Sequence, residues 1–183
     1  METTRGQLLV ATPLIDTGTF LRAVVLILNH DEDGALGVIL NRPLDADIEE
    51  FFPNISELVS SPMLLFQGGP VDVESALAVG ILQGDQEPIG WQTMVGNFGL
   101  VDLAIPSALV SKEIQGVRVF AGYTGWSAGQ LEAEIEEGSW LVVPSRPEDL
   151  TSANPESLWH DVLGRQTGDV RLYASFPDDP NLN

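Results

Sequence analysis

The residues with the clearest capacity for chemistry form the pentapeptide Gly125-Trp126-Ser127-Ala128-Gly129. This pentapeptide satisfies G-x-S-x-G, the pattern that places a nucleophilic serine at the turn between a strand and a helix in serine hydrolases. Asp149 and His160 then follow in the order serine, acid, histidine that a catalytic triad can take. The pattern raises a hydrolase hypothesis with Ser127 as the nucleophile, and a second version of it uses His30 as a general base.

Ser127 also has a competing structural interpretation. Ser127-x-x-Gln130 is the spacing of a capping box, in which the serine oxygen accepts a hydrogen bond from the helix and the glutamine side chain reaches back. Asp149 and His160 are only eleven residues apart, and no HGGG-like oxyanion segment precedes them. We therefore favour a helix cap over a nucleophile at Ser127.

Two further segments have the composition of binding loops without the spacing of a known site. His30 lies beside Asp31 and Asp33, but the carboxylates that an EF-hand loop requires further along the chain are missing. The turn Gly68-Gly69-Pro70 offers main-chain N–H groups to an anion, yet it lacks the lysine and hydroxyl residues of a P-loop. We favour a hydrogen-bonded histidine and a tight turn, and we expect no metal and no cofactor.

The segment Asn41-Arg42-Pro43 places an arginine at the end of a predicted buried strand. Such an arginine either pairs with one of the many carboxylates or serves as a bidentate clamp for an anionic ligand or a partner peptide. Tyr123 and Trp126, with Gly125 between them, offer an aromatic wall that a ligand can approach closely. Packing in the core explains these two aromatic residues equally well.

Composition excludes several classes of protein. The chain has 183 residues, no cysteine and a formal charge of −19, from 8 Lys and Arg against 27 Asp and Glu. The absence of cysteine excludes disulfides, thiolate zinc sites, iron–sulfur ligation and cysteine nucleophiles. An apolar content of 44% with a mean hydropathy of +0.10 indicates a globular protein, and the length suits one domain.

The distribution of charge disfavours nucleic acid as a partner. Between Arg42 and Lys112 the chain has no Lys, Arg or His, and the remaining cations are scattered singly. Duplex affinity comes mostly from Lys and Arg side chains that neutralise phosphates. No stretch approaches the roughly 20 apolar residues of a membrane span, and the first residues lack a signal-peptide pattern. We expect a cytoplasmic protein without direct contact to nucleic acid or membrane.

The elements that must position these residues are mostly strands. The apolar runs Ala23–Leu28 and Ala35–Leu40, joined by the turn sequence NHDEDG, predict a buried hairpin and hence antiparallel pairing. A meander of short strands follows, and the last third of the chain has the pattern strand, loop, helix, strand. The other predicted strands are 7–11, 63–67, 76–82, 89–95, 100–104, 117–121 and 140–143, and the predicted helices are 45–52, 127–137 and 155–163.

Taken together, these segments resemble the bacterial YqgE/AlgH family. The resemblance covers residues 6–164 and is carried by GQLLVATPLI, VVLILNHDEDGALGVILNRPL, FQGGPV, RVFAGYTGWSAGQLEAEIEEGSWLVV and LWHDVLG. It implies an α+β fold, with a mixed, largely antiparallel sheet curled toward a partial barrel and helices packed on it. We expect a single domain over residues 1–176 and a frayed tail over 177–183.

The resemblance also refines the candidate site. The family commonly has glycine or another small residue at position 127, which weakens the case for a serine nucleophile. Polar and aromatic motif residues at loop tips more often serve binding than packing, so we expect one groove built from the strand end and the GYTGW loop. The candidate ligand- or partner-binding residues are His30, Asn41, Arg42, Gly68, Gly69, Tyr123, Gly125, Trp126 and Gln130.

The family name reflects an association with transcriptional control of alginate synthesis in some bacteria, and the biochemical activity of its members is not established. The motifs are poor in paired catalytic acids and bases and in metal ligands. We therefore expect a non-enzymatic binding or regulatory module, a monomer or weak dimer whose partner is a protein or a small anionic ligand. A hydrolase-like enzyme that uses Ser127 or His30 is the alternative.

Overall fold

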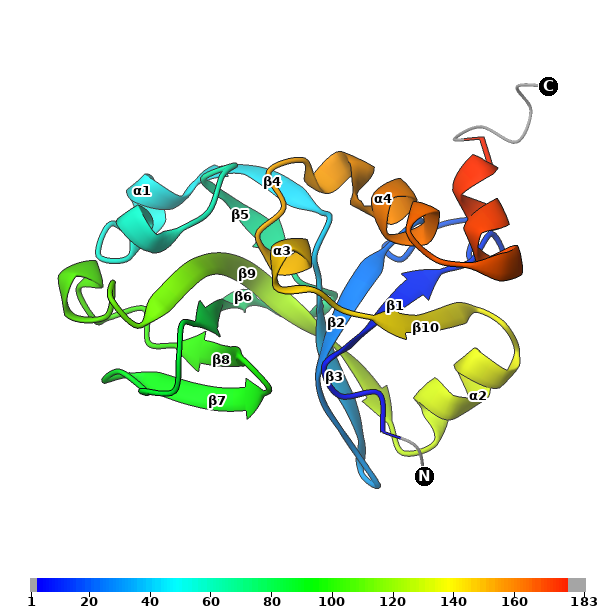
Figure 1. Cartoon of the computed structure of the whole chain (residues 1–183), viewed down its shortest axis with the longest axis horizontal. Helices are drawn as coiled ribbons and strands as arrows, with labels where there is room; N and C mark the ends of the chain where they lie inside the picture. The colour runs from blue at the N-terminus through cyan, green and yellow to red at the C-terminus, as the bar shows by residue number, and fades with distance from the viewer. Residues whose placement is uncertain (1–2, 178–183) are drawn as a thin grey trace.

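One long strand, β9 (Ile114–Ser127), connects the two halves of the sheet. In the computed structural model, which describes residues 3–177, this strand pairs with β3 and β5 along one edge and with β6 along the other. The continuous path of the sheet is β10-β1-β2-β3-β9-β6-β8-β7, and β4 and β5 lie off this path. Figure 1 shows the sheet curling around β9, which confirms the expected α+β half-barrel.

The N-terminal half of the sheet is antiparallel throughout. The pairing of β2 with β3 confirms the predicted hairpin, and its register runs from Val25 opposite Ile39 to Asp31 opposite Gly34. The strand β10 pairs with β1 at one end of the path. The bounds are Gln7–Ala11 for β1, Val24–Asp31 for β2, Gly34–Ile39 for β3 and Trp140–Pro144 for β10.

The other half contains the four short strands predicted after the hairpin, but they do not form a meander. The strand β9 lies between β5 and β6, and β8 lies between β6 and β7, so of these four only β7 and β8 are neighbours both in the chain and in the sheet. Two further expectations are corrected as well. The helix predicted over 45–52 is a strand for its first residues, because Pro43 and Asp47 pair with β5. Only Ile48–Phe51 form a helix, α1. The GYTGW segment is not a loop but the last third of β9. The bounds are Pro43–Asp47 for β4, Leu64–Gln67 for β5, Val71–Leu82 for β6, Trp91–Val95 for β7 and Phe98–Val101 for β8.

Helices cover opposite faces of the curled sheet (Figure 1). The helix α4 (Leu158–Gly164) packs its apolar stripe into a core with β1, β2 and β3, and Trp159 Nε1 donates to Ala11 O at 2.8 Å. The helix α2 (Gln130–Glu136) packs Leu131 into a second core on the other face. The short α3 (Pro147–Leu150) follows β10. The 3-10 helices are Ser56–Leu58, Ser107–Leu109, Pro155–Ser157 and Gly168–Ser175.

No helix among residues 3–177 is both long and apolar enough to cross a membrane. The frayed tail expected over 177–183 lies outside the described residues from position 178 onward.

The centre of β9 contains a buried arginine that the sequence did not single out. Arg118 is 1% exposed, and its guanidinium carbon lies 4.3 Å from the centre of the Phe66 ring. All of its hydrogen bonds go to main-chain carbonyl oxygens, and no carboxylate among residues 3–177 pairs with it. Burial lowers the pKa of Arg118 to about 10. The five carbonyls belong to Ser60, Ser61, Pro62, Leu150 and Ser152.

We predict that Arg118→Lys lowers the free energy of unfolding by roughly 3 kcal/mol, because a lysine ammonium has three donors and leaves buried carbonyls without a partner. Chemical denaturation followed by circular dichroism measures the change. Arg171→Lys in the last 3-10 helix, at an exposed position, is the matched control and should change stability by less than about 0.5 kcal/mol. Equal stability of the two variants would contradict this role for Arg118.

Candidate functional site

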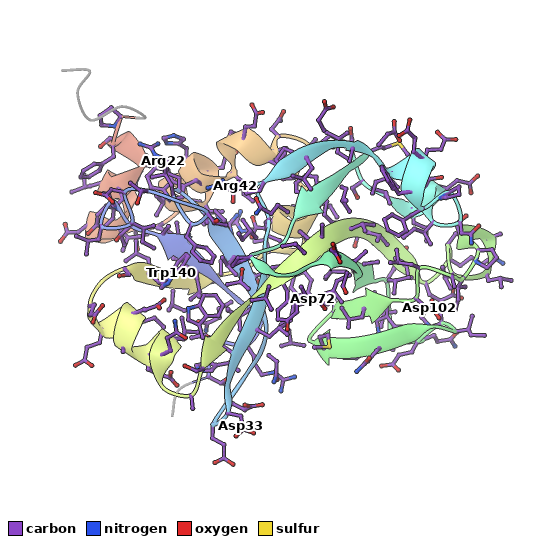
Figure 2. The ribbon with its side chains drawn as sticks, turned by 180° about the vertical axis from the view of Figure 1, so that it is seen from behind. Arg22, Asp33, Arg42, Asp72, Asp102 and Trp140 are labelled. Carbon is purple, nitrogen blue, oxygen red and sulfur yellow. The ribbon has the colours of Figure 1, made fainter. Side chains whose placement is uncertain are left out.

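The candidate residues do not form the single groove expected from the sequence. Asn41 follows the end of β3, whereas Trp126 pairs with Ala35 at the start of the same strand. Six residues of strand separate the two places by about 20 Å. The expectation of one surface was wrong because the GYTGW segment is a strand whose register with β3 fixes Trp126 at the far end from Arg42. Figure 2 shows Arg42 at one end of the hairpin of β2 and β3 and Asp33 at the turn at its other end.

Asn41 and Arg42 hold the start of β2 through main-chain contacts. The buried Asn41 side chain accepts from Val24 N at 2.9 Å and donates to Arg22 O at 2.8 Å. Arg42 donates to Asn41 O at 3.1 Å and to Leu21 O. No carboxylate among the described residues pairs with Arg42, and burial lowers its pKa. The ion pair considered for Arg42 is therefore not formed within this part of the chain.

Gly68, Gly69 and Tyr123 meet at the middle of β9. The Gly68 N–H donates to Ala121 O at 2.9 Å, and Gly68 O accepts from Thr124 Oγ1 at 3.1 Å. A Cβ at Gly68 would lie 2.2 Å from Gly122 O, and one at Gly69 would lie 2.2 Å from Tyr123 O. Glycine is needed here because the main chain after β5 lies directly against β9.

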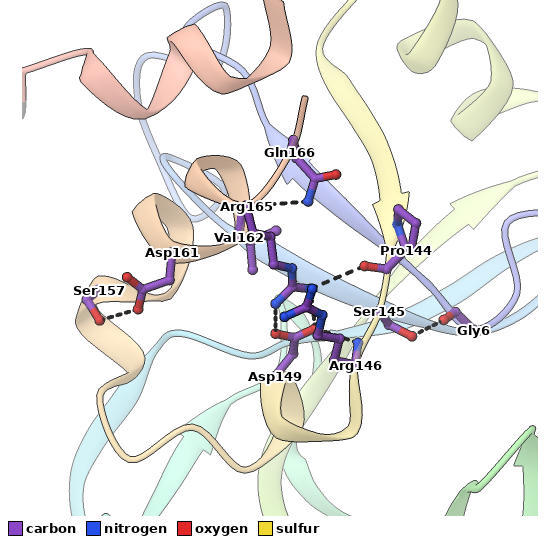
Figure 3. A network of polar contacts seen from close by, with 10 residues as sticks. All are labelled: Gly6, Pro144, Ser145, Arg146, Asp149, Ser157, Asp161, Val162, Arg165 and Gln166. Carbon is purple, nitrogen blue, oxygen red and sulfur yellow. Dashed lines mark hydrogen bonds and ion pairs between the residues drawn. The ribbon is translucent and has the colours of Figure 1, made fainter. Parts of the chain in front are cut away.

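The three residues of the triad hypothesis lie apart and have other partners. Asp149 is buried and accepts from Arg165 at 2.6 and 2.7 Å and from Arg146 N at 2.7 Å (Figure 3). His160 contacts Arg22 at 3.1 Å and Ala174 O at 3.0 Å. The hydroxyl of Ser127 bonds to neither. These contacts contradict the triad hypothesis, which the short spacing of Asp149 and His160 already disfavoured.

The expected capping box at Ser127 forms only in part. Gln130 Oε1 accepts from Ser127 N at 3.0 Å, which is the returning half of the motif. The Ser127 hydroxyl donates to the same oxygen at 3.2 Å instead of accepting from the helix. Gly129, with φ of 74°, stands directly before the helix. Ser127 therefore positions Gln130 rather than capping α2.

One carboxylate fixes α2 against the sheet. Glu134 Oε2 accepts from both indole nitrogens, Trp126 Nε1 at 2.9 Å and Trp140 Nε1 at 2.8 Å. The two indole rings meet edge to face with centroids 6.0 Å apart. Gln130 Nε2 donates to the other oxygen, Glu134 Oε1, at 3.0 Å. Trp126 and Gln130 thus belong to a structural cage around Glu134.

His30 connects the N-terminal segment to the same helix. The main-chain N–H of Thr4 donates to His30 Nδ1 at 3.1 Å, and the Thr4 hydroxyl lies 2.9 Å from that nitrogen. Since Nδ1 accepts, Nε2 carries the hydrogen and donates to Glu132 Oε1 at 3.0 Å. His30 is buried, and Glu132 is partly exposed. The histidine therefore fixes the orientation of a carboxylate at the surface.

A cleft of about 590 Å³ opens in front of this contact. It lies between α2, the N-terminal segment and the start of β1, and we call it the α2 cleft. Its lining combines carboxylates, hydroxyls, an amide and two aliphatic side chains. The lining residues are Thr3, Thr4, Gln7, Glu132, Ile135, Glu136 and Val142. Among residues 3–177, no group of three or more His, Cys, Asp and Glu side chains is arranged to hold a metal ion.

A family model described as AlgH-like (DUF179) matches residues 8–171 of this chain. The chain belongs to the AlgH-like family. The UPF0301 protein of Streptomyces coelicolor is 48% identical, with 97% of this chain and 94% of the relative covered. A UPF0301 protein of Thermobifida fusca is 44% identical over the same shares.

Two solved structures have the fold of this AlgH-like chain. A crystal structure of protein DIP2367 from Corynebacterium diphtheriae is 31% identical, with a TM-score of 0.88 and 96% of this chain and 94% of that one covered. The solution structure of the AlgH protein from Pseudomonas aeruginosa has a TM-score of 0.66 over 98% of this chain and 100% of that one. Its identity of 22% supports the fold alone.

The sequence reasoning missed most of the cleft of this AlgH-like protein. Glu132 was noticed only as part of the motif GQLEAE, Gln7 only as the first residue of a predicted strand, and Thr4 not at all. The available signal was the spacing of Glu132 and Glu136, four residues apart and therefore on one face of a helix. Nothing in the sequence indicates that His30 reaches this helix across 102 positions.

We predict that Glu134→Leu lowers the free energy of unfolding by roughly 2–3 kcal/mol, because two indole N–H groups with little exposure lose their acceptor. Urea denaturation monitored by tryptophan fluorescence measures the loss. Glu137→Leu, an exposed position at the end of the same helix, is the matched control and should stay within about 0.5 kcal/mol of the parent. A small effect of Glu134→Leu would show that the cage does not hold α2.

Proposed function

We propose that this AlgH-like protein is a non-enzymatic binding module, and that the α2 cleft receives a positively charged group of its ligand. The observation that carries the proposal is the cleft itself, which combines apolar walls with a carboxylate held in place by a buried histidine. Concave sites with a few fixed polar groups are the usual form of ligand sites. This assignment replaces the anionic ligand expected from Arg42, which does not line the cleft.

The charge of the lining supports a cationic group. Glu132 and Glu136 contribute two carboxylates, and no Lys or Arg lies among the lining residues. Hydrogen bonds from its own main chain and from His30 lower the pKa of Glu132. This side chain therefore stays negatively charged at pH values where an ordinary glutamate begins to take up a proton. Ile135 and Val142 provide apolar surface for the methylene stem of an amine or guanidinium.

The surroundings of Ser127 support a binding role over hydrolysis. A serine nucleophile requires a base within hydrogen-bond reach, and the hydroxyl of Ser127 bonds instead to the amide oxygen of Gln130. His30 Nε2 donates to Glu132, and Nδ1 is used by Thr4. The net charge of −19 supports a regulatory role without direct contact to DNA, since phosphates would be repelled.

We predict that a fluorophosphonate probe leaves Ser127 unlabelled, because its hydroxyl donates to Gln130 Oε1 and no base among residues 3–177 is hydrogen-bonded to it. Intact-protein mass spectrometry after incubation at pH 8 detects any adduct, and chymotrypsin in a parallel sample shows that the probe is active. Labelling that disappears in Ser127→Ala would support the hydrolase alternative instead.

We predict that Nα-acetyl-lysine amide, called lysine amide below, raises the melting temperature of the protein and that Nα-acetyl-norleucine amide, its uncharged analogue, does not. A ligand at 100 times its Kd adds about 2.7 kcal/mol of stability. Glu132→Gln and Glu136→Gln should each weaken binding about tenfold, because each removes one carboxylate from the lining. Since the pKa of Glu132 is lowered, the shift with the parent protein should persist from pH 7 to pH 5.

The matched control for this experiment is Glu137→Gln, which follows directly after α2 and lies outside the cleft, so this variant should bind lysine amide like the parent. Glutarate tests the opposite charge and should give no shift. Equal shifts with glutarate and lysine amide, or unchanged binding in both cleft variants, would contradict a cationic site.

A further inference from the structure

The strand β10 has an outer edge that faces away from the sheet. It is the terminal strand of the sheet path, and its strand partner is β1. The N–H of Ala11 donates to Ala23 O on the far side of β1, whereas the N–H of Thr12 donates to Ser139 O next to β10. Because antiparallel pairing alternates along a strand, Leu8 and Val10 bond to β10, and Leu9 and Ala11 face β2.

This alternation determines which main-chain groups of β10 are directed outward. Leu8 lies opposite Val143 and Val10 opposite Leu141, so these two residues of β10 bond inward. The N–H and C=O groups of Trp140 and Val142 are therefore directed to the outer edge. Among residues 3–177, no hydrogen bond from a turn, loop or side chain reaches the main-chain groups of either residue.

The outer edge has one closed end. Pro144 has no N–H, and its carbonyl accepts from Arg165 Nη2 at 3.2 Å. Figure 3 shows this contact beside the ion pair of Arg165 with Asp149. A strand that pairs with β10 is therefore limited to the stretch of Trp140 and Val142. Such a short edge provides few main-chain hydrogen bonds, so a partner needs a further anchor.

The α2 cleft lies next to this edge. The side chain of Val142 is 36% exposed and forms part of the cleft wall, and Ile135 of α2 lines the same wall. Side chains of an added strand alternate between the two faces of the sheet. A residue directed to the α2 face beside Val142 would therefore enter the cleft toward Glu136 and Glu132.

We propose that an extended segment of a partner protein adds to the outer edge of β10 and places one Lys or Arg side chain in the α2 cleft. This inference rests on the proposed function, because it uses the same cationic site. Strand addition supplies main-chain hydrogen bonds, and a pocket for alternate side chains supplies selectivity. Charge complementarity selects the occupant, because the chain has a net charge of −19 and the cleft has two carboxylates.

The probe that tests the inference is the acetylated and amidated peptide Thr-Val-Lys-Val-Thr, titrated into the full-length, isotope-labelled protein. The amide signals of Trp140 and Val142 should shift on binding, because their N–H groups gain an acceptor. Replacing the lysine of the peptide by norleucine, or Glu136 of the protein by glutamine, should weaken binding at least tenfold.

Two N-methylated peptides separate strand addition from simple capture of the lysine. One has N-methyl groups on its two valines, and the other has them on the lysine and the last threonine. In an added strand only alternate N–H groups face β10, so one isomer should bind like the parent peptide and the other at least tenfold more weakly. This comparison leaves the protein unchanged.

The outcomes distinguish the inference from the proposed function. If both isomers bind like the parent peptide, or if lysine amide binds and the peptide does not, strand addition is wrong and the cationic site stands. If neither lysine amide nor the peptide binds, both proposals are wrong. Unchanged signals of Trp140 and Val142 during tight peptide binding would also overturn strand addition.

Discussion

The coordination of five main-chain carbonyls by Arg118 is the constraint on which the rest of the fold depends. It joins the centre of β9 to the loop before β5 and to the segment after α3, which lie 58 positions before it and 34 after it. A buried cation without a carboxylate is costly unless every donor is used, and here all five N–H groups have acceptors. These bonds therefore fix the position of β9 at Arg118, between the two ends of the strand, which pair with separate halves of the sheet.

The far end of β9 leads directly to the contacts that shape the cleft. Trp126 lies near the end of the stretch of β9 that pairs with β3. Its indole nitrogen donates to Glu134 on the helix that follows. Two residues earlier on that helix, Glu132 contacts His30. The two acidic residues of the motif GQLEAE therefore have different roles. Glu134 holds the helix against the sheet, and Glu132 is oriented at the surface by His30.

The sequence predicted the hairpin and the strand–helix–strand order because apolar alternation and turn residues report local structure. The predicted meander was wrong because the order of strands in a sheet depends on long-range pairing, which placed β9 between β5 and β6 and β8 between β6 and β7. It placed Asn41 and Trp126 on one surface because both belong to motifs, and motif membership contains no information on register. The glycines of GYTGW indicated a loop, whereas Gly122 takes a positive φ of 70° within a continuous strand. Long-range contacts such as Thr4 with His30 follow from tertiary packing, which one sequence without relatives does not encode in any periodic signal.

The cage around Glu134 also has an optical consequence. Two of the four tryptophans of the chain direct their indole N–H groups at a single carboxylate, and both rings are buried. Indole emission responds to nearby charge and to the loss of a hydrogen bond. If α2 moved away from the sheet, Trp126 and Trp140 would lose this carboxylate and their emission would change. The tryptophan fluorescence of the native protein therefore reports whether the helix beside the cleft is packed in place.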